Sequence, residues 1–376
     1  MIYLDYAANA PVDERVLDEY VYATKKYFAN PNSTHKLGLE AKEAIDNASK
    51  IIAKSLGVKE DEIIYTSGAS ESNNLVIQGI CNRYKNKGKH IIISKLEHNS
   101  IVAPASYMQS LGFEVDMVSP NNNGVIDLDE LKSLIRDDTI LVSITSVDSE
   151  LGIRQPIEEI GAMLKEYPNL YFHTDASQII GKDNIDLTNV DLVTIAPHKF
   201  YGVNGIGLLI KRKEIGLVPI IYGGKSTTIY RSGTPVTASI LATSKAVELA
   251  INELDERKKQ ISKLNKYIID ILKKDSNIFI NSTSSSILNT INFSVRGVIS
   301  TDFVKMLGEK DVFVSTKASC CPDNSPSKSV YALTNDKTLA SSSIRLSISH
   351  VTTKEEIDKF FEIFYDTLKE YKNGKK

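Results

Sequence analysis

The sequence contains no tryptophan, only three cysteines in 376 residues, and almost no net charge. Three cysteines are too few for the disulfide framework of a small secreted protein. The 45 basic and 47 acidic residues give a formal net charge of −2, so no positive excess favours binding to nucleic acid. No run approaches the roughly 18 consecutive apolar residues of a membrane span, and the start lacks the pattern of a secretory signal. We therefore expect a cytoplasmic globular protein that binds neither nucleic acid nor a membrane.

What the sequence does contain is a regular alternation of strand-like and helical segments. A helical pattern over 39–56 ends at Gly57, and further helical patterns follow at 71–85, 128–135 and 157–165. Between them lie short apolar runs typical of buried strands, at 63–66, 90–94, 113–118, 140–147, 170–175, 192–196 and 207–211. This alternation predicts an α/β fold with a largely parallel sheet covered by helices on both faces. Ligands of such sheets bind at the carboxyl ends of the strands.

The two ends of the chain have a different pattern. The opening segment is predicted as a loop, because Asn9 and Pro11 interrupt it. A long helical stretch over 237–274 is expected to lead out of the first unit, and strand-like runs at 291–295 and 343–348 precede an amphipathic final helix. We predict a large domain of residues 16–245 and a small α+β domain made of residues 1–15 and 246–376.

The segment DLVTIAPHKFYGVNGIG, residues 191–207, holds the first candidate for chemistry. Lys199 follows a predicted buried strand and precedes a glycine-rich loop, so we expect it at a cleft. A lysine that is partly withdrawn from water loses proton affinity, and a neutral amine can form a Schiff base with an aldehyde. The alternative is an ordinary exposed lysine at a strand end.

Two other segments complete a set of groups that one cofactor needs. Asp175 closes a predicted strand in YFHTDASQ, where its carboxylate could pair with a pyridinium nitrogen or only cap the next segment. TSGASESNN is a glycine turn that opens a helix, and Ser70 with the amides of Gly68 and Ala69 could hold a phosphate or serve only as a helix cap. An aldehyde-binding lysine, a pyridinium partner and a phosphate site together indicate pyridoxal 5'-phosphate (PLP).

These segments, in this order, resemble the class V aminotransferase family and, within it, the cysteine desulfurases. The resemblance extends from YLDYAANAP to SSSIRLSIS and includes HKxYGxxGIG around Lys199. It implies a fold-type I enzyme whose large domain has a mostly parallel seven-stranded sheet, beside a smaller α+β domain. It also implies that Lys199 binds PLP covalently and that L-cysteine is converted to L-alanine.

By the same resemblance, several residues around the ring receive roles. Gln178 would bond the ring hydroxyl while Asp175 keeps the ring nitrogen protonated. His98 in LEHNS would stack on the ring and assist proton transfer, although a hydrogen-bonded loop histidine is the alternative. His198 is also expected in the site, and the role of His35 stays open.

The resemblance also assigns the substrate and sulfur-handling residues. Arg345 would bind the substrate carboxylate, the alternative being a salt bridge to a nearby acid. Thr234 in RSGTP would reach the phosphate in a second subunit, which implies a homodimer. Cys320 in VSTKASCCPDNSPSKSV would take the sulfur as a persulfide for a sulfur-acceptor protein. Its neighbour Cys321 lacks the CxxC spacing of a metal site, so we expect no metal, and Cys81 is predicted to be packed in a helix.

Several positions depart from the family pattern, and each loses a hydrogen bond worth about 0.5–1.5 kcal/mol. They are Ser149 in VDSELG, Ala196 before the His-Lys pair, Lys225 and Ser226 in GGKST near the cofactor, and Lys317-Ala318 before the cysteines. The departures leave two alternatives open. One is another class V lyase or aminotransferase acting on selenocysteine, cysteine sulfinate or another amino acid, and the other is a weakly active scaffold for sulfur-transfer proteins. The receiving pathway stays open among iron–sulfur cluster assembly, tRNA thiolation and selenium metabolism.

Overall fold

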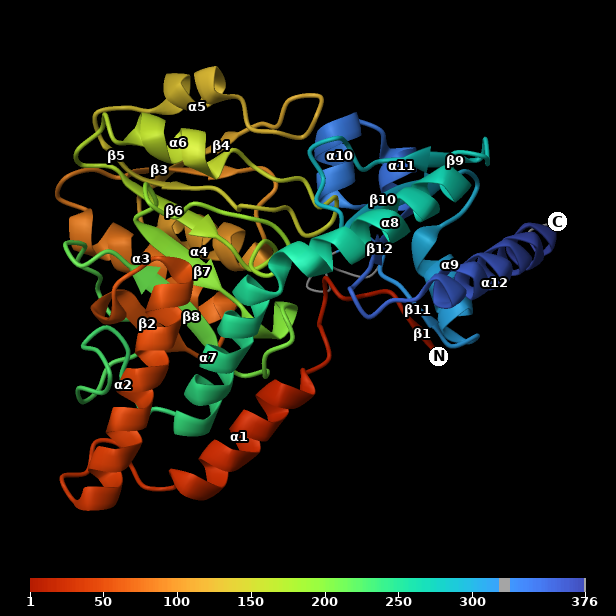
Figure 1. Cartoon of the computed structure of the whole chain (residues 1–376). Coiled ribbons are helices and arrows are strands. Elements are labelled where there is room, and N and C mark those ends of the chain that lie inside the picture. Colours follow the sequence, from red (N-terminus) through yellow and green to blue (C-terminus); the bar gives the residue numbers. More distant parts are fainter. Residues whose placement is uncertain (318–324, 375–376) are drawn as a thin grey trace.

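The computed structural model describes residues 1–317 and 325–374, which form two lobes connected by long helices (Figure 1). The larger lobe is built on a seven-stranded sheet of order β2-β8-β7-β6-β5-β3-β4. Its strands are β2 (Ile63–Thr66), β3 (His90–Ser94), β4 (Glu114–Val118), β5 (Thr139–Ser143), β6 (Tyr171–Asp175), β7 (Leu192–Ile195) and β8 (Gly207–Lys211). Strand β8 runs antiparallel to β2 and β7, and the other neighbours are parallel. The predicted α/β class and mostly parallel seven-stranded sheet are confirmed.

Helices cover both faces of this sheet, because its strands are apolar on both sides. Along β3, Ile92 packs into one core, whereas Ile91 and Ile93 pack into the other. Helices α3 (Ala69–Tyr84) and α4 (Asn99–Ser110) cover the second core. The first core is covered by α1 (Glu14–Lys26), α2 (Lys36–Leu56), α5 (Leu128–Leu134), α6 (Ile157–Leu164) and α7 (Thr237–Asn252). Cys81 of α3 is fully buried in the second core, as predicted.

The sequence analysis predicts no element for residues 14–26, which form α1. The N-cap of α1 is Asp13, whose side chain accepts a hydrogen bond from the amide of Arg15. Val16, Tyr20 and Ala23 lie on one face of this amphipathic helix and pack against the large core. Strand β5 also ends at Ser143, earlier than the apolar run that extends to residue 147.

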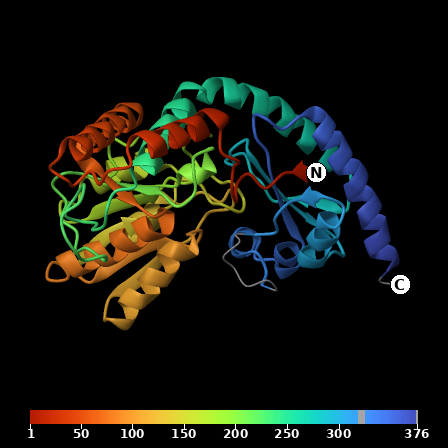
Figure 2. The ribbon, with the colours of Figure 1, turned by 90° about the horizontal axis from the view of Figure 1, so that it is seen from below.

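The smaller lobe has an antiparallel three-stranded sheet, and α7 and α8 (Leu254–Leu272) run along one side of both lobes (Figure 2). The sheet order is β12-β10-β9, formed by β9 (Ile278–Ile280), β10 (Thr290–Val295) and β12 (Ser343–Ser347). β1 (Ile2–Tyr3) pairs in parallel with β11 (Val312–Phe313). The remaining helices are α9 (Ser300–Gly308), α10 (Lys328–Thr334), α11 (Lys337–Ser341) and α12 (Lys354–Asn373). The predicted α+β character of this unit is therefore confirmed.

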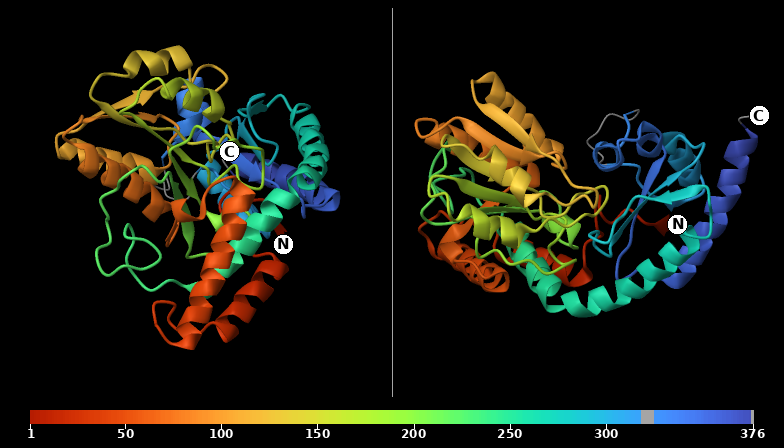
Figure 3. Two further views of the ribbon diagram at one scale, coloured as in Figure 1. Left: turned by 60° about the vertical axis from the view of Figure 1, so that its left-hand side comes forward. Right: turned by 90° about the horizontal axis from the view of Figure 1, so that it is seen from above.

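The chain passes between the two lobes at its start and again at α7–α8, as Figure 3 shows. Ile2 and Leu4 pack into the core of the small lobe, whereas Val16 packs into that of the large lobe. Residues of α7 up to Ala250 belong to the large core, and α8 from Ile261 onward belongs to the small one. The exact domain boundaries given above stay a prediction. None of the helices in the described ranges combines the length and apolarity that crossing a membrane requires.

Candidate active site

A cavity of about 380 Å³ lies where the carboxyl ends of β2, β6 and β7 face the small lobe. Ala7 and Ala8 of the first segment contribute to its wall, as do residues that follow β3 and β5. Ten of the predicted site residues line it: Gly68, Ala69, Ser70, His98, Ser149, Asp175, Gln178, His198, Lys199 and Arg345. Thr234 is exposed and lies outside this lining, and Cys320 lies outside the described residues. The structure thus gathers into one cavity residues that are more than 300 positions apart in the chain, such as Ala7 and Arg345.

Lys199 ends a short 3-10 helix (Pro197–Lys199) that directly follows β7. The lysine is half-buried, and its Nζ donates hydrogen bonds to the backbone oxygens of Ala7 at 3.0 Å and Ala8 at 2.6 Å. The chain then turns tightly, because Tyr201 has a φ of 71° and a Cβ at Gly202 would lie 2.6 Å from the Cβ of Pro197. The glycine-rich loop therefore holds the lysine at the cavity.

The predicted phosphate site is the start of α3, which has Gly68 as its N-cap. The first amides of a helix have no partner within the helix and attract anions. A Cβ at Gly207 would lie 2.5 Å from the carbonyl carbon of Gly68, so only glycine on β8 lets this turn pack so closely. The amide of Ser67 donates to Glu71 at 2.7 Å, and Glu71 forms an ion pair with Arg231 at 3.0 Å. Sequence reasoning missed this ion pair, which joins the 219–236 loop to the phosphate site.

The carboxylate of Asp175 is buried at the end of β6 and is held at both oxygens. Its Oδ1 accepts from the amide of Ser177 at 2.9 Å, so the capping alternative is also present. Its Oδ2 accepts from Nδ2 of Asn73 at 2.8 Å. Sequence reasoning did not identify Asn73, although the residue lies within the glycine-turn motif. The two bonds fix the carboxylate in the cavity wall.

Three histidines with predicted or open roles have different environments. His98 is the N-cap of α4, with its Nδ1 near the Oγ of Ser100 at 2.7 Å, and burial lowers its pKa. Burial, aided by the charge of Lys199, lowers the pKa of His198 to about 4. Both rings are therefore neutral at physiological pH. His35 is exposed and caps α2, and it does not line the cavity.

Gln178 lies one turn after Asp175, and both ends of its amide group have partners. Its Nε2 donates to the backbone oxygen of Ala7 at 2.9 Å, the same oxygen that Lys199 contacts. Its Oε1 accepts from Nζ of Lys182 at 2.6 Å. The amide is thus held in one orientation within the cavity wall.

Arg345 is the small lobe's charged contribution to the cavity, and it is 2 % exposed. Its guanidinium donates to the backbone oxygen of Ser149 at 2.8 Å and pairs with Asp5 at 2.6 Å. The alternative of a salt bridge is therefore real and coexists with a place in the cavity. The Nε of Arg345 is buried and has no hydrogen-bond partner among the described residues.

Two buried acids beside the site were not predicted. Burial raises the pKa of Glu97 to about 8, and its Oε1 accepts from the hydroxyl of Ser94 and the amide of Thr145. Burial, with the nearby charge of Glu150, raises the pKa of Asp148 to about 7. Glu97 lies within LEHNS and Asp148 within VDSELG, but the sequence does not show that either carboxyl group is buried.

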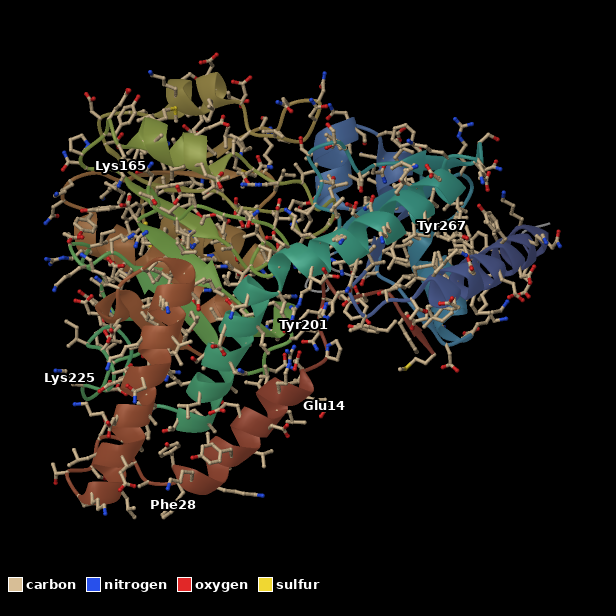
Figure 4. The ribbon with its side chains drawn as sticks, viewed as in Figure 1. Glu14, Phe28, Lys165, Tyr201, Lys225 and Tyr267 are labelled. Carbon is tan, nitrogen blue, oxygen red and sulfur yellow. The ribbon has the colours of Figure 1, made fainter. Side chains whose placement is uncertain are left out.

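The departures from the family pattern fall at different distances from the cavity. Ser149 and Ala196 line it, whereas Ser226 and the exposed Lys225 do not line the cavity of their own chain; Figure 4 shows Lys225 in the loop beside α2. Lys317 is buried, and its Nζ donates to the backbone oxygen of Ser325 at 2.7 Å. Among the departures that the structure describes, Ser149 and Ala196 are the two that line the cavity, and Ala318 lies outside the described residues.

Comparison with known proteins gives a consistent result along the whole chain. The family described as Aminotransferase class-V matches residues 2–360. The cysteine desulfurase IscS of Dictyoglomus turgidum is 40% identical over 362 residues, which cover 95% of this chain and 92% of that protein. A solved structure of a NifS-like protein has a TM-score of 0.92 at 31% identity and covers 98% of this chain and 99% of the other. A structure of SspA in complex with cysteine has a TM-score of 0.82 at 31% identity, covering 94% and 100%.

Proposed function

The chain belongs to the class V aminotransferase family and, within it, to the cysteine desulfurases, and we propose how its own residues carry out that reaction with PLP. The reaction converts L-cysteine to L-alanine, and the sulfur passes to Cys320. The observation that supports this most strongly is the single cavity that unites Lys199, Asp175 and the start of α3.

The residues of the cavity fit PLP on three separate grounds. An amine that can bind an aldehyde, Lys199, lines the same cavity as the buried carboxylate of Asp175, which suits a protonated ring nitrogen. The N-terminus of α3 supplies amides for a phosphate. Gly207 has no side chain, so β8 can pack closely against the turn at Gly68 that precedes these amides. When bound, PLP withdraws electrons from the substrate carbons attached to it.

The protein groups then act in order around the substrate. Lys199 would hold the cofactor through its amine, and its Nζ lies where it could move the proton of the substrate α-carbon. His98, which burial keeps neutral, is placed to assist as proton acceptor. Arg345 binds the substrate carboxylate, since its guanidinium lines the cavity and its Nε has no partner among the described residues.

Sulfur transfer is assigned to Cys320 from the sequence. Its thiolate forms an S–S bond with the substrate sulfur as the Cβ–S bond breaks. The electron pair of the broken bond stays on Cβ, which then takes up a proton, so the products are L-alanine and a persulfide on Cys320. A sulfur-acceptor protein removes the persulfide, and a cytoplasmic location stays a prediction from composition.

A homodimer is part of the proposal. Large apolar side chains are exposed on α1, α2 and the 219–236 loop, among them Phe28, Leu39, Tyr222 and Ile229. Such a group of exposed apolar residues is typical of a contact surface. Figure 4 shows Phe28 at the end of α1 and Lys225 in the loop beside α2. Pairing through these elements would leave Thr234 free to reach the phosphate site of the second copy.

The test is the visible spectrum of the purified protein with PLP, recorded before and after addition of L-cysteine, with alanine quantified. We expect an absorption band of lysine-bound cofactor that changes on adding cysteine, and at least one alanine formed per protomer. A band that cysteine leaves unchanged, with turnover of selenocysteine or cysteine sulfinate instead, would favour a different class V enzyme, the second candidate that Ser149 and Ala196 motivate. The absence of any band would favour the scaffold.

A further inference from the structure

A second lysine lies behind the cavity wall, four residues after Gln178. Lys182 is 8 % exposed, and its Nζ donates to Oε1 of Gln178 at 2.6 Å. The turn that places it depends on Gly181, which has a φ of 73°, and a Cβ there would approach Ala250 to 3.0 Å and Phe200 to 3.2 Å. The turn therefore packs against α7 and against the residue that follows Lys199.

Lys182 is connected to Lys199 through the Gln178 amide and the backbone oxygen of Ala7. The amide of Gln178 accepts from Lys182 at its oxygen and donates through Nε2 to the backbone oxygen of Ala7 at 2.9 Å. The same oxygen accepts from Nζ of Lys199 at 3.0 Å. Because an ammonium group can only donate, an amide turned the other way would bring its Nε2 donors against Nζ of Lys182, so the charged Lys182, together with the Ala7 oxygen, fixes which end of the Gln178 amide faces the cavity.

The burial of Lys182 and the cations around it make its charged form unfavourable. Burial, together with the charges of Lys199 and Arg345, lowers its pKa to about 7. In turn Lys182 is one of the charges that lower the pKa of the facing His198. The adjacent acid Asp183 pairs with Lys258 and Arg154. Arg345 has its own acid in Asp5. A buried amine among cations reduces stability, so its presence calls for a role in the site.

We propose that Lys182 is a positioning residue for the cofactor site: its Nζ orients the Gln178 amide toward Ala7 and the cavity, and its charge beside Lys199 sets how the site responds to pH. This inference deepens the proposed function and rests on it. The second N–H of the Gln178 amide is left for the ring hydroxyl of the cofactor, so a rotated amide would present an oxygen there and repel the ring oxygen.

The first test uses PLP-loaded protein with Lys182→Met and Lys182→Arg, and Lys211→Met as control. Lys211 is a buried lysine of β8 whose Nζ donates to the backbone oxygen of Ile215, outside the cavity. A nearby positive charge disfavours a second one, so loss of the Lys182 charge should raise the pH midpoint of the visible absorption change by about 0.5–1 unit. Lys182→Arg should keep the wild-type midpoint or lower it, and Lys211→Met should leave it unchanged.

The second test uses cofactor-free protein and does not depend on activity. In the folded chain the pKa of Lys182 is lowered to about 7, whereas in the unfolded chain it stays near the ordinary lysine value of 10.5. The cost of the buried charge is therefore complete below neutral pH and declines as pH rises. Lys182→Met should raise Tm most at about pH 6 and least at about pH 9.5.

The two tests separate failure of this inference from failure of the proposed function. A wild-type protein without the cofactor band contradicts the proposed function itself. Two results would overturn the role of Lys182 and leave the proposed function intact. One is a pH midpoint of the visible absorption change that is the same in wild type and in Lys182→Met. The other is a Tm difference between wild type and Lys182→Met that does not vary with pH. A midpoint shift of equal size in Lys182→Arg would also overturn it, because arginine keeps the charge.

Discussion

The two sides of the cavity hold their polar groups in different ways. On the large-lobe side, the partners of Asp175 are Asn73 and the amide of Ser177, both from the same lobe. On the small-lobe side, Arg345 pairs with Asp5 of the first segment and is held across the boundary by the backbone oxygen of Ser149. The small lobe also sends hydroxyl groups across this boundary, since Ser329 donates to Asp148 at 2.7 Å and Ser327 donates to Glu150.

The difference indicates two separable tasks. On the cofactor side, the Asp175 carboxylate is held within one lobe, and Gln178 and Lys199 also contact the first segment of the chain, at Ala7. The substrate side depends on contacts between lobes, and one of these involves Asp148, a buried acid whose pKa is raised. Changes on the first side should therefore affect cofactor binding, and changes on the second should affect substrate binding or stability.

The largest effect is expected on the cofactor side, from Lys199→Ala. Loss of the amine should remove covalent cofactor binding and lower kcat by about 10³-fold or more, because both nucleophile and proton acceptor are lost. Alanine formation and the absorption of the protein after gel filtration measure the two losses. Activity near the wild-type level would contradict the role of Lys199 on the cofactor side. Lys211→Met serves as the matched control.

A smaller and different effect is expected from Arg345→Ala. Loss of a charge-assisted contact to the carboxylate should raise KM for L-cysteine by about 10²-fold, with the cofactor band retained. Asp5→Asn sharpens the test because it removes the ion pair and keeps the guanidinium. If Asp5→Asn raises KM as much as Arg345→Ala does, the arginine acts through the salt bridge and not on the substrate.

The smallest effect concerns stability at the lobe boundary. Asp148 has a raised pKa, so its charged form costs stability; this cost is absent below the ordinary value of 3.8, grows as pH rises from there, and is complete above about 7. Asp148→Asn should therefore raise Tm by about 1–3 °C at alkaline pH and by less near pH 5. Thermal unfolding at the two pH values measures this. An equal change at both would contradict the role of the charge.

The sequence predicts the fold well because its signals are local. Buried strands with apolar residues on both faces appear in the sequence as continuous apolar runs. Because ligands of such sheets bind at the carboxyl ends of the strands, Asp175 and Lys199 are expected at the same edge of the sheet. Helix α1 was missed although Val16, Tyr20 and Ala23 recur at helical spacing on its buried face. The fold class, family and enzyme were predicted correctly from the order of motifs.

The contacts of the site were less predictable. Lys199 is held by backbone oxygens of Ala7 and Ala8, and a backbone oxygen carries no sequence signal. The raised pKa of Asp148 and the lowered pKa of Lys182 follow from burial, which depends on how distant segments pack. The roles of Cys320 and Thr234 stay predictions.

The most direct test of the central claim compares wild type, Cys320→Ala and Cys321→Ala, all loaded with PLP. The cofactor band, alanine release from L-cysteine and protein-bound persulfide are measured on each. If cofactor binding and sulfur transfer are separable, Cys320→Ala keeps the band and loses persulfide and multiple-turnover alanine, while Cys321→Ala retains all three. Normal alanine and persulfide formation by Cys320→Ala would contradict the account.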